Sequence, residues 1–273
     1  MLTTIKNIII LIISAYILFL ICAYFLTDSV IFSPRTHSYK DNSNILKLTT
    51  KDGASISAIY LPNPKATYTL LFSHGNAEDL NYLLPMLHLF QQHGFSVFAY
   101  DYHGYGTSTG YPNEKNIYND INVAYVYLTQ YLNISPTKII AFGHSIGAAA
   151  SIELAAHKKL GGLIVQSAFL SATRVITKIP LVPFDKWNNY KKIKSIACPI
   201  FFIHGTRDTI VPFWHAQKLY DAAIASKQYL WIVGAGHNDL LNIAGENYWY
   251  AIDNFLRRNC RYPKEKIDLE YAK

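Results

Sequence analysis

The chain contains little cysteine and lacks the residue clusters of a metal site. Three cysteines occur in 273 residues: Cys22 in an apolar run, Cys198 at the start of a predicted strand, and Cys260 near the carboxyl end. Nothing in the sequence pairs Cys198 with Cys260, so cysteine content leaves the redox compartment open. No Cys/His cluster has metal-ligand spacing, and we expect neither a metal nor another cofactor.

Internal repeats, low-complexity tracts and long linkers are also absent. A chain of 273 residues, 51% of them hydrophobic, can bury one large core. We therefore predict an N-terminal segment, residues 1–30, followed by one domain of about 240 residues, residues 31–273.

Acidic residues are fewer than basic ones, 18 against 25, which gives a formal net charge of +7. Basic clusters occur at Lys191-Lys192-Lys194 and at Arg257-Arg258-Arg261. They can attract anionic lipid headgroups, or they can simply be solvated faces, and the sequence leaves both readings open. No nucleic-acid-binding motif accompanies the charge, so we expect no nucleic-acid partner.

One long hydrophobic run stands near the amino end. Ile8 to Leu26 contains 19 residues and no charge, close to the roughly 20 residues that span a bilayer. A cleaved signal peptide has a shorter apolar run and a small-residue cleavage site, so we predict a retained single-pass membrane anchor. Lys6 and the free amine before the run nearly balance Arg35 and Lys40 after it. We place the amino end inside and the domain outside the cytoplasm.

The most informative motif is G-x-S-x-G, centred on Ser145 between Gly143 and Gly147. A buried strand is predicted before it, at 137–142, and a helix rich in small residues after it, at 146–157. This strand–turn–helix context is that of a nucleophile elbow, in which the turn is too tight for side chains beside the serine. Ser145 is therefore the predicted nucleophile.

A serine nucleophile needs a base, itself oriented by an acid. In the elbow-containing fold the chain order is serine, acid, histidine. Asp208 follows a predicted strand at 198–203, and His237 follows the strand at 228–233. Both would lie at the carboxyl ends of their strands, where α/β folds place functional groups. We predict Asp208 as the acid and His237 as the base.

Two other histidines compete for the role of base. His204 ends a strand and is expected to pack or to bond to loop backbone, and His144 lies inside the elbow and points elsewhere. Asp239 is expected to cap the helix that follows His237.

Two backbone donors are predicted for the oxyanion, each worth about 3–4 kcal/mol. One is the N–H of Ile146, at the positive end of its helix. The other is the N–H of Asn76, in the loop that follows the strand at 67–72, with Ala77 as the alternative.

These motifs resemble the α/β-hydrolase superfamily, in particular the membrane-anchored, serine-aminopeptidase-like branch that includes protein depalmitoylases. The resemblance implies a triad of Ser145, Asp208 and His237, and oxyanion donors at Asn76 and Ile146. His103 stands where relatives usually have arginine, and Ala148 where a second glycine is common. The matching segments are 72–79, 100–110, 143–147, 202–208 and 236–238.

Alternating strands and helices predict an α/β fold: a mostly parallel eight-stranded sheet with helices on both faces. The strands are expected near 45–50, 54–60, 67–72, 95–100, 137–142, 162–167, 198–203 and 228–233. The helices are expected near 79–92, 114–131, 146–158, 213–226 and 239–258.

Residues 168–196 are predicted to form a short cap. Phe169-Leu170, the run 179–184 and Trp187 make it apolar, either to receive an acyl chain or to cover the sheet.

We expect a serine hydrolase acting on acyl esters, thioesters or lipid-like substrates. A serine peptidase or aminopeptidase is the alternative, disfavoured because Asp185 is the only acid in the cap. A non-catalytic, membrane-tethered scaffold is the third possibility. The oligomeric state is left open.

Overall fold

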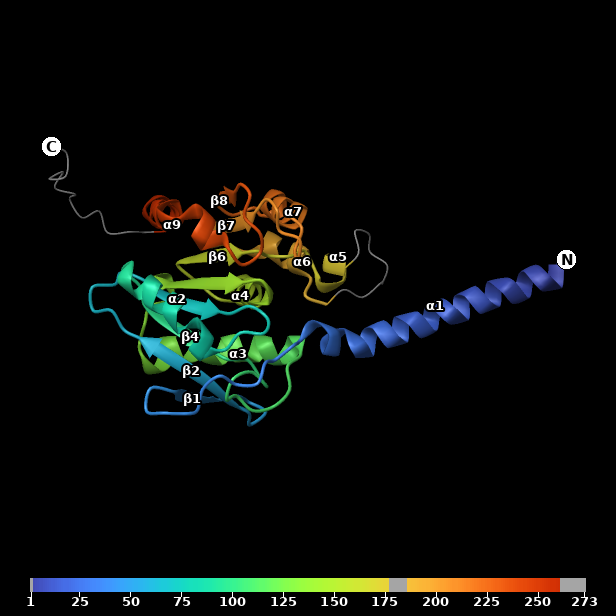
Figure 1. The fold of residues 1–273 in the computed structure, drawn as a ribbon, viewed down its shortest axis with the longest axis horizontal. Coiled ribbons are helices and arrows are strands. Elements are labelled where there is room, and N and C mark those ends of the chain that lie inside the picture. Colours follow the sequence, from blue (N-terminus) through green and yellow to red (C-terminus); the bar gives the residue numbers. More distant parts are fainter. Residues whose placement is uncertain (1, 177–185, 261–273) are drawn as a thin grey trace.

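The computed structural model describes residues 2–176 and 186–260, and its domain is built on one eight-stranded sheet (Figure 1). The strand order is β1-β2-β4-β3-β5-β6-β7-β8. All eight predicted strands are confirmed. They are β1 Leu46–Thr49, β2 Ser55–Leu61, β3 Thr69–Ser73, β4 Ser96–Tyr100, β5 Ile139–His144, β6 Gly162–Gln166, β7 Ile200–Gly205 and β8 Lys227–Ile232.

The sheet is antiparallel at one edge and parallel over the rest. β2 pairs antiparallel with β1 and β4, whereas all pairings from β4 through β8 are parallel. Because parallel strands end at the same edge, the loops after β3, β5, β7 and β8 meet there. The predicted mostly parallel α/β sheet is confirmed.

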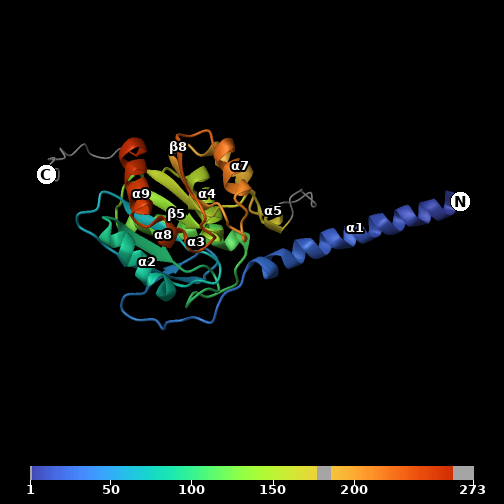
Figure 2. The same cartoon turned by 45° about the horizontal axis from the view of Figure 1, so that its top comes forward.

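Helices cover both faces of the sheet (Figures 1 and 2). Apolar side chains of α2, α8 and α9 join one core cluster, and those of α3, α4 and α7 join the other. The bounds are α2 Leu80–Gln92, α3 Glu114–Val126, α4 Ile146–His157, α7 Trp214–Ala222, α8 Leu240–Ala244 and α9 Glu246–Asn259. Shorter helical segments are α5 Ala172–Ile176, α6 Asn189–Lys192, η1 Tyr127–Tyr131, η2 Pro136–Lys138 and η3 Ile193–Ser195.

Three helix predictions need correction. The helix predicted over 239–258 is two helices, because Gly245 lies between them at φ 54°, a conformation that glycine adopts without strain. The helix predicted over 213–226 ends at Ala222. Asp239 does not cap α8 with its side chain; its Oδ1 instead accepts the N–H of Gly236 at 2.7 Å.

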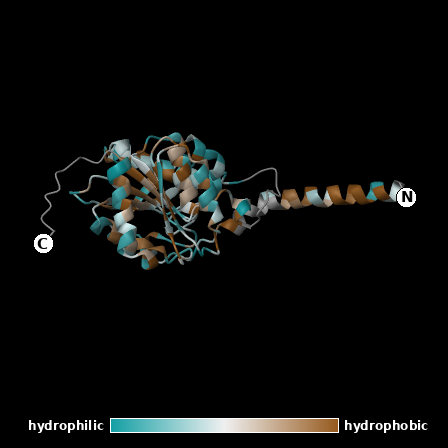
Figure 3. Ribbon diagram, turned by 90° about the horizontal axis from the view of Figure 1, so that it is seen from above, coloured by the Kyte–Doolittle hydropathy of each residue, from teal (hydrophilic) through white to brown (hydrophobic). Residues whose placement is uncertain are grey.

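The N-terminal helix α1, Leu2–Ile31, projects away from the domain (Figures 1 and 3). Its segment Thr3–Cys22 has a mean hydropathy of 2.5, and none of it is buried against the domain. By length and composition it can cross a membrane, although a signal sequence near the amino end has the same properties.

The described part of the predicted cap covers the sheet. Phe169 and Leu170 are buried in the core, and Trp187 is 0% exposed. The Trp187 ring packs against Phe32 and Tyr118, at centroid distances of 5.9 and 5.2 Å. These three predicted cap residues therefore serve the core. The apolar run 179–184 and Asp185 lie outside the described residues.

Two glycines let α4 start against the sheet. A Cβ built on Gly147 would lie 2.1 Å from the carbonyl oxygen of Ser73, and one built on Gly143 would lie 2.2 Å from that of Gly147. The register pairs Ser73 with Gly143, so β3, β5 and the start of α4 meet at one point. Side chains at positions 143 and 147 would separate them, which confirms the tight turn predicted from sequence.

We expect Gly147→Ala to lower the free energy of unfolding by about 2–3 kcal/mol, because its methyl group would overlap backbone that cannot rotate away. Gly53→Ala is the control: it meets nothing within 4 Å but has φ 85°, so about 1 kcal/mol of backbone strain is expected. Chemical denaturation of the full chain in detergent measures both. Equal losses would contradict the close-packing argument.

Candidate active site

Ser145 occupies a strained position between β5 and α4. Its backbone has φ 56° and ψ −114°, outside the conformations that a non-glycine residue prefers. Its N–H donates to the carbonyl oxygen of Gln166 at 2.9 Å, and β5 and α4 hold the flanking residues. The surrounding structure therefore holds the backbone of Ser145 in this strained conformation. In this conformation the serine side chain lies at the edge of the sheet.

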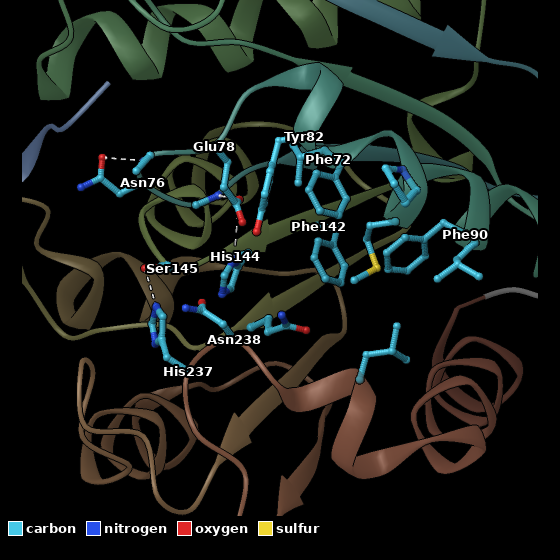
Figure 4. Close-up of a pocket in the computed structure, with 18 of the residues that line it drawn as sticks. Phe72, Asn76, Glu78, Tyr82, Phe90, Phe142, His144, Ser145, His237 and Asn238 are labelled. Carbon is cyan, nitrogen blue, oxygen red and sulfur yellow. Dashed lines mark hydrogen bonds and ion pairs between the residues drawn. The ribbon is translucent and has the colours of Figure 1, made fainter. Parts of the chain in front are cut away.

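The structure brings the three predicted catalytic residues together (Figure 4 shows Ser145 and His237). His237 Nε2 lies 3.0 Å from Ser145 Oγ, and His237 Nδ1 lies 2.7 Å from Asp208 Oδ2. Asp208 follows β7 and His237 follows β8, as expected for loops that meet at the carboxyl edge of a parallel sheet. The arrangement has the hydrogen-bond order nucleophile, imidazole, carboxylate.

Asp208 is held as a carboxylate. Its Oδ1 accepts the backbone N–H groups of Ile210 and Val211, at 2.9 and 2.8 Å. Burial alone would raise its pKa, but hydrogen bonds from His204 and His237 prevail and hold the pKa of Asp208 well below its usual value. The charge needed to orient the imidazole is therefore present at neutral pH.

Burial lowers the pKa of His237 below its usual value, and the opposing hydrogen bond to Asp208 only partly restores it. His237 is therefore neutral at pH 7, the state that a base requires. His204 is engaged elsewhere: its Nε2 lies 2.8 Å from the carbonyl oxygen of Val211 and 3.3 Å from Asp208 Oδ2. This bond to loop backbone confirms the structural role predicted for His204.

The two predicted oxyanion donors are open. Among the hydrogen bonds of residues 2–176 and 186–260, none uses the backbone N–H of Asn76 or of Ile146. The alternative donor differs, because the Ala77 N–H already donates to Asn76 Oδ1 at 3.1 Å. The geometry therefore favours Asn76 over Ala77 as the partner of Ile146.

Sequence reasoning missed the part played by Glu78. Its Oε2 accepts the N–H of Gly75 at 2.7 Å and lies 3.9 Å from His144 Nδ1. Burial opposes ionisation, but His144 and His74 prevail and lower the pKa of Glu78 to about 2. Glu78 is thus a carboxylate in the same loop as Asn76. The motif at 72–79 contained it, but nothing in the sequence indicated its contacts.

A cavity of about 580 Å³ begins at Ser145 and His237 and runs between α2 and α8 (Figure 4). Its lining includes the polar side chains of Arg35, Glu78, Tyr82 and His144. Phe72, Phe142 and Phe90 lie on the side away from Ser145 and His237 (Figure 4), and the lining also includes the apolar residues Leu83, Met86, Leu89 and Leu241. The lining includes none of the described cap residues, so the apolar space beside Ser145 lies on the α2 side of the sheet.

Comparisons with known proteins agree with this fold. A family model described as serine aminopeptidase, S33, matches residues 64–190, which include Asn76 and Ser145 but end before Asp208. Human α/β hydrolase domain-containing protein 17B is 38% identical over 206 residues, covering 74% of this chain and 71% of that protein. The Caenorhabditis elegans α/β hydrolase domain-containing protein aho-3 is 40% identical over 182 residues, covering 66% of this chain.

The aligned part spans only 55% of the nematode protein's own length. Among solved structures, the Pyrococcus furiosus esterase Pf2001 aligns with a TM-score of 0.70 over 84% of this chain and 99% of that one. At 23% identity this likeness concerns the fold alone.

The lowered pKa of His237 predicts the pH dependence of any hydrolysis in which His237 acts as the base. Protonation of His237 removes the base, so kcat/KM should fall only as pH drops through a value below the usual 6.5. A pH profile of kcat/KM for a water-soluble ester measures this acid limb. A midpoint above 6.5 would contradict the environment described for His237.

Proposed function

The chain belongs to the α/β-hydrolase superfamily, and on that premise we propose that it is a serine hydrolase cleaving esters or thioesters of acyl groups. The observation that carries the proposal is the continuous hydrogen-bond chain from Ser145 Oγ through His237 to Asp208, with distances of 3.0 and 2.7 Å. A serine, a neutral imidazole and a buried carboxylate in this order constitute an activated nucleophile.

In the proposed reaction, His237 Nε2 takes the hydroxyl proton of Ser145 while Oγ attacks the substrate carbonyl. The N–H groups of Asn76 and Ile146 stabilise the oxyanion, and Asp208 stabilises the imidazolium. His237 then gives the proton to the departing alkoxide or thiolate, which leaves an acyl-enzyme. His237 deprotonates a water molecule that attacks this ester and then returns the proton to the departing Ser145 Oγ, so that the acid and free Ser145 are released. The steps need no cofactor.

The cavity between α2 and α8 supports an acyl substrate. Ser145 lines it together with many apolar side chains of β3, β5 and α2, so an acyl chain whose carbonyl lies at Ser145 Oγ can extend into it. The apolar helix α1 supports attachment to a membrane as a single-pass protein, with the side of the domain left open. We therefore propose that acyl esters or thioesters near a lipid surface are the substrates.

A serine aminopeptidase is the second candidate, because the matching family model carries that description. The carboxylate of Glu78 lines the cavity and could hold a substrate ammonium group. However, Glu78 already accepts the N–H of Gly75 and lies beside His144. We therefore favour the acyl hydrolase. We also favour an enzyme over a non-catalytic scaffold, because a scaffold would not need hydrogen-bonded Ser145, His237 and Asp208 side chains.

The assignment of the nucleophile is testable with a fluorescent fluorophosphonate. We expect the full-length protein in membranes to be labelled, and Ser145→Ala to lose labelling and at least about a thousandfold in ester turnover. Ser151→Ala is the matched control, since it removes a buried serine hydroxyl from α4 outside the cavity. Labelling that persists in Ser145→Ala would overturn the assignment, and an inactive but folded wild type would favour the scaffold. An aminoacyl amide cleaved faster than acyl esters would favour the peptidase.

The place of the acyl chain is testable through chain-length preference. Met86→Trp should fill part of the apolar space of the cavity and reduce kcat/KM for long-chain esters at least about tenfold, with little change for acetyl or butyryl esters. His88→Trp is the control, because it adds the same ring to the exposed side of α2. A uniform effect of Met86→Trp on all chain lengths would contradict an acyl chain in this cavity.

A further inference from the structure

The side chain of Asn76 joins the loop after β3 to the end of the N-terminal helix. Its Nδ2 donates to the carbonyl oxygen of Ile31, the last residue of α1, at 2.6 Å. Its Oδ1 accepts the N–H of Ser33 at 3.1 Å. Residues more than 40 positions apart in sequence are thus held by one carboxamide, on both sides of Phe32.

The same oxygen also organises the loop itself. Asn76 Oδ1 accepts the hydroxyl of Tyr105 at 2.6 Å and the N–H of Ala77 at 3.1 Å. Ala77 has φ 59°, a conformation that a residue with a Cβ adopts only when neighbouring bonds enforce it. With Gly75 N–H held by Glu78, both amides next to that of Asn76 are occupied, and the Asn76 N–H is left for a ligand.

The segment after α1 is anchored in the domain on the active-site side. Phe32 is 6% exposed and packs against the buried ring of Trp187. Arg35, three residues further, lines the catalytic cavity and lies over the ring of Tyr82. The end of α1 and the lining of the cavity are therefore parts of one packed structure, although none of the segment Thr3–Cys22 is buried against the domain.

We propose that the Asn76 side chain is a positioning residue: it fixes the Asn76 N–H relative to Ser145 by tying the oxyanion loop to the end of α1. The inference rests on the proposed serine hydrolase function. Because a preorganised donor stabilises the oxyanion only at the correct place, the rate of acyl transfer depends on how the segment after the membrane-type helix is held. The position of the segment that follows α1 and the catalytic rate are thereby connected.

Three substitutions in the full-length protein in detergent test the proposal, with a water-soluble short-chain ester as substrate. Asn76→Ala keeps the backbone N–H but removes all four side-chain bonds, and should lower kcat about 10- to 100-fold at unchanged KM. Ser33→Pro and Tyr105→Phe each remove one donor to Oδ1 and should lower kcat about fivefold. In the Asn76→Ala background both should have no further effect, since their shared acceptor is gone.

An alkyl boronic acid, which forms a tetrahedral adduct with an activated serine, provides the second readout. Its inhibition constant should rise in parallel with the fall in kcat/KM across the three variants, as expected for a group that acts on the transition state. If the Asn76 side chain had a purely structural role, the variants would instead have lower melting temperatures, and the inhibition constant would not change in proportion to kcat/KM. Tyr125→Phe is the control, because its hydroxyl bonds the carbonyl oxygen of Lys159, away from the site.

A kcat of Asn76→Ala within about twofold of wild type, or full additivity in the double variants, would overturn the proposal. The Ser145→Ala variant measured alongside separates this failure from failure of the function. If Ser145→Ala stays active, the serine hydrolase is wrong; if it is inactive while Asn76→Ala is not impaired, only the positioning role is wrong.

Discussion

The close approach of α4 to the end of β3 is the constraint on which the site depends. At Gly147 the helix lies so near the Ser73 carbonyl that no side chain fits between them. This contact brings the loop after β3, which carries Asn76, beside the first turn of α4, which carries Ile146. The two open N–H groups can therefore converge on one point next to Ser145. A wider spacing would separate the two proposed oxyanion donors from Ser145, the proposed nucleophile.

Much of this arrangement could be predicted from sequence because it is encoded locally. Each strand that carries a functional loop is a short apolar run, and Ser145, Asp208 and His237 each follow one. The order of these loops and the parallel sheet then bring the side chains together without further information. The sequence also indicated the close packing through glycines 143 and 147, since a tight turn restricts the residues on both sides of the nucleophile.

The remaining features depend on contacts between distant segments, and no local pattern encodes them. The break at Gly245 was missed because the amphipathic pattern continues through it, and only the positive φ of the folded chain reveals two helices. The cavity runs between α2 and α8 rather than under the described cap residues, because Trp187 and its neighbours are needed to cover the core. The bonds of Asn76 to residues 31 and 33 span more than 40 positions, so its side chain gave no signal in the sequence.

Glu78 places a negative charge in the loop after β3, close in sequence to the proposed oxyanion donor Asn76. A carboxylate near a developing oxyanion would oppose its formation, and in a site of low dielectric this repulsion is costly. Glu78 accepts the Gly75 N–H, and its interactions with His144 and His74 lower its pKa to about 2. The carboxylate thus orders the backbone before Asn76, while the Asn76 carboxamide orders the backbone after it. With both neighbours fixed, the amide of Asn76 would be preorganised for the oxyanion role that we propose, even though an acidic side chain lies in the same loop.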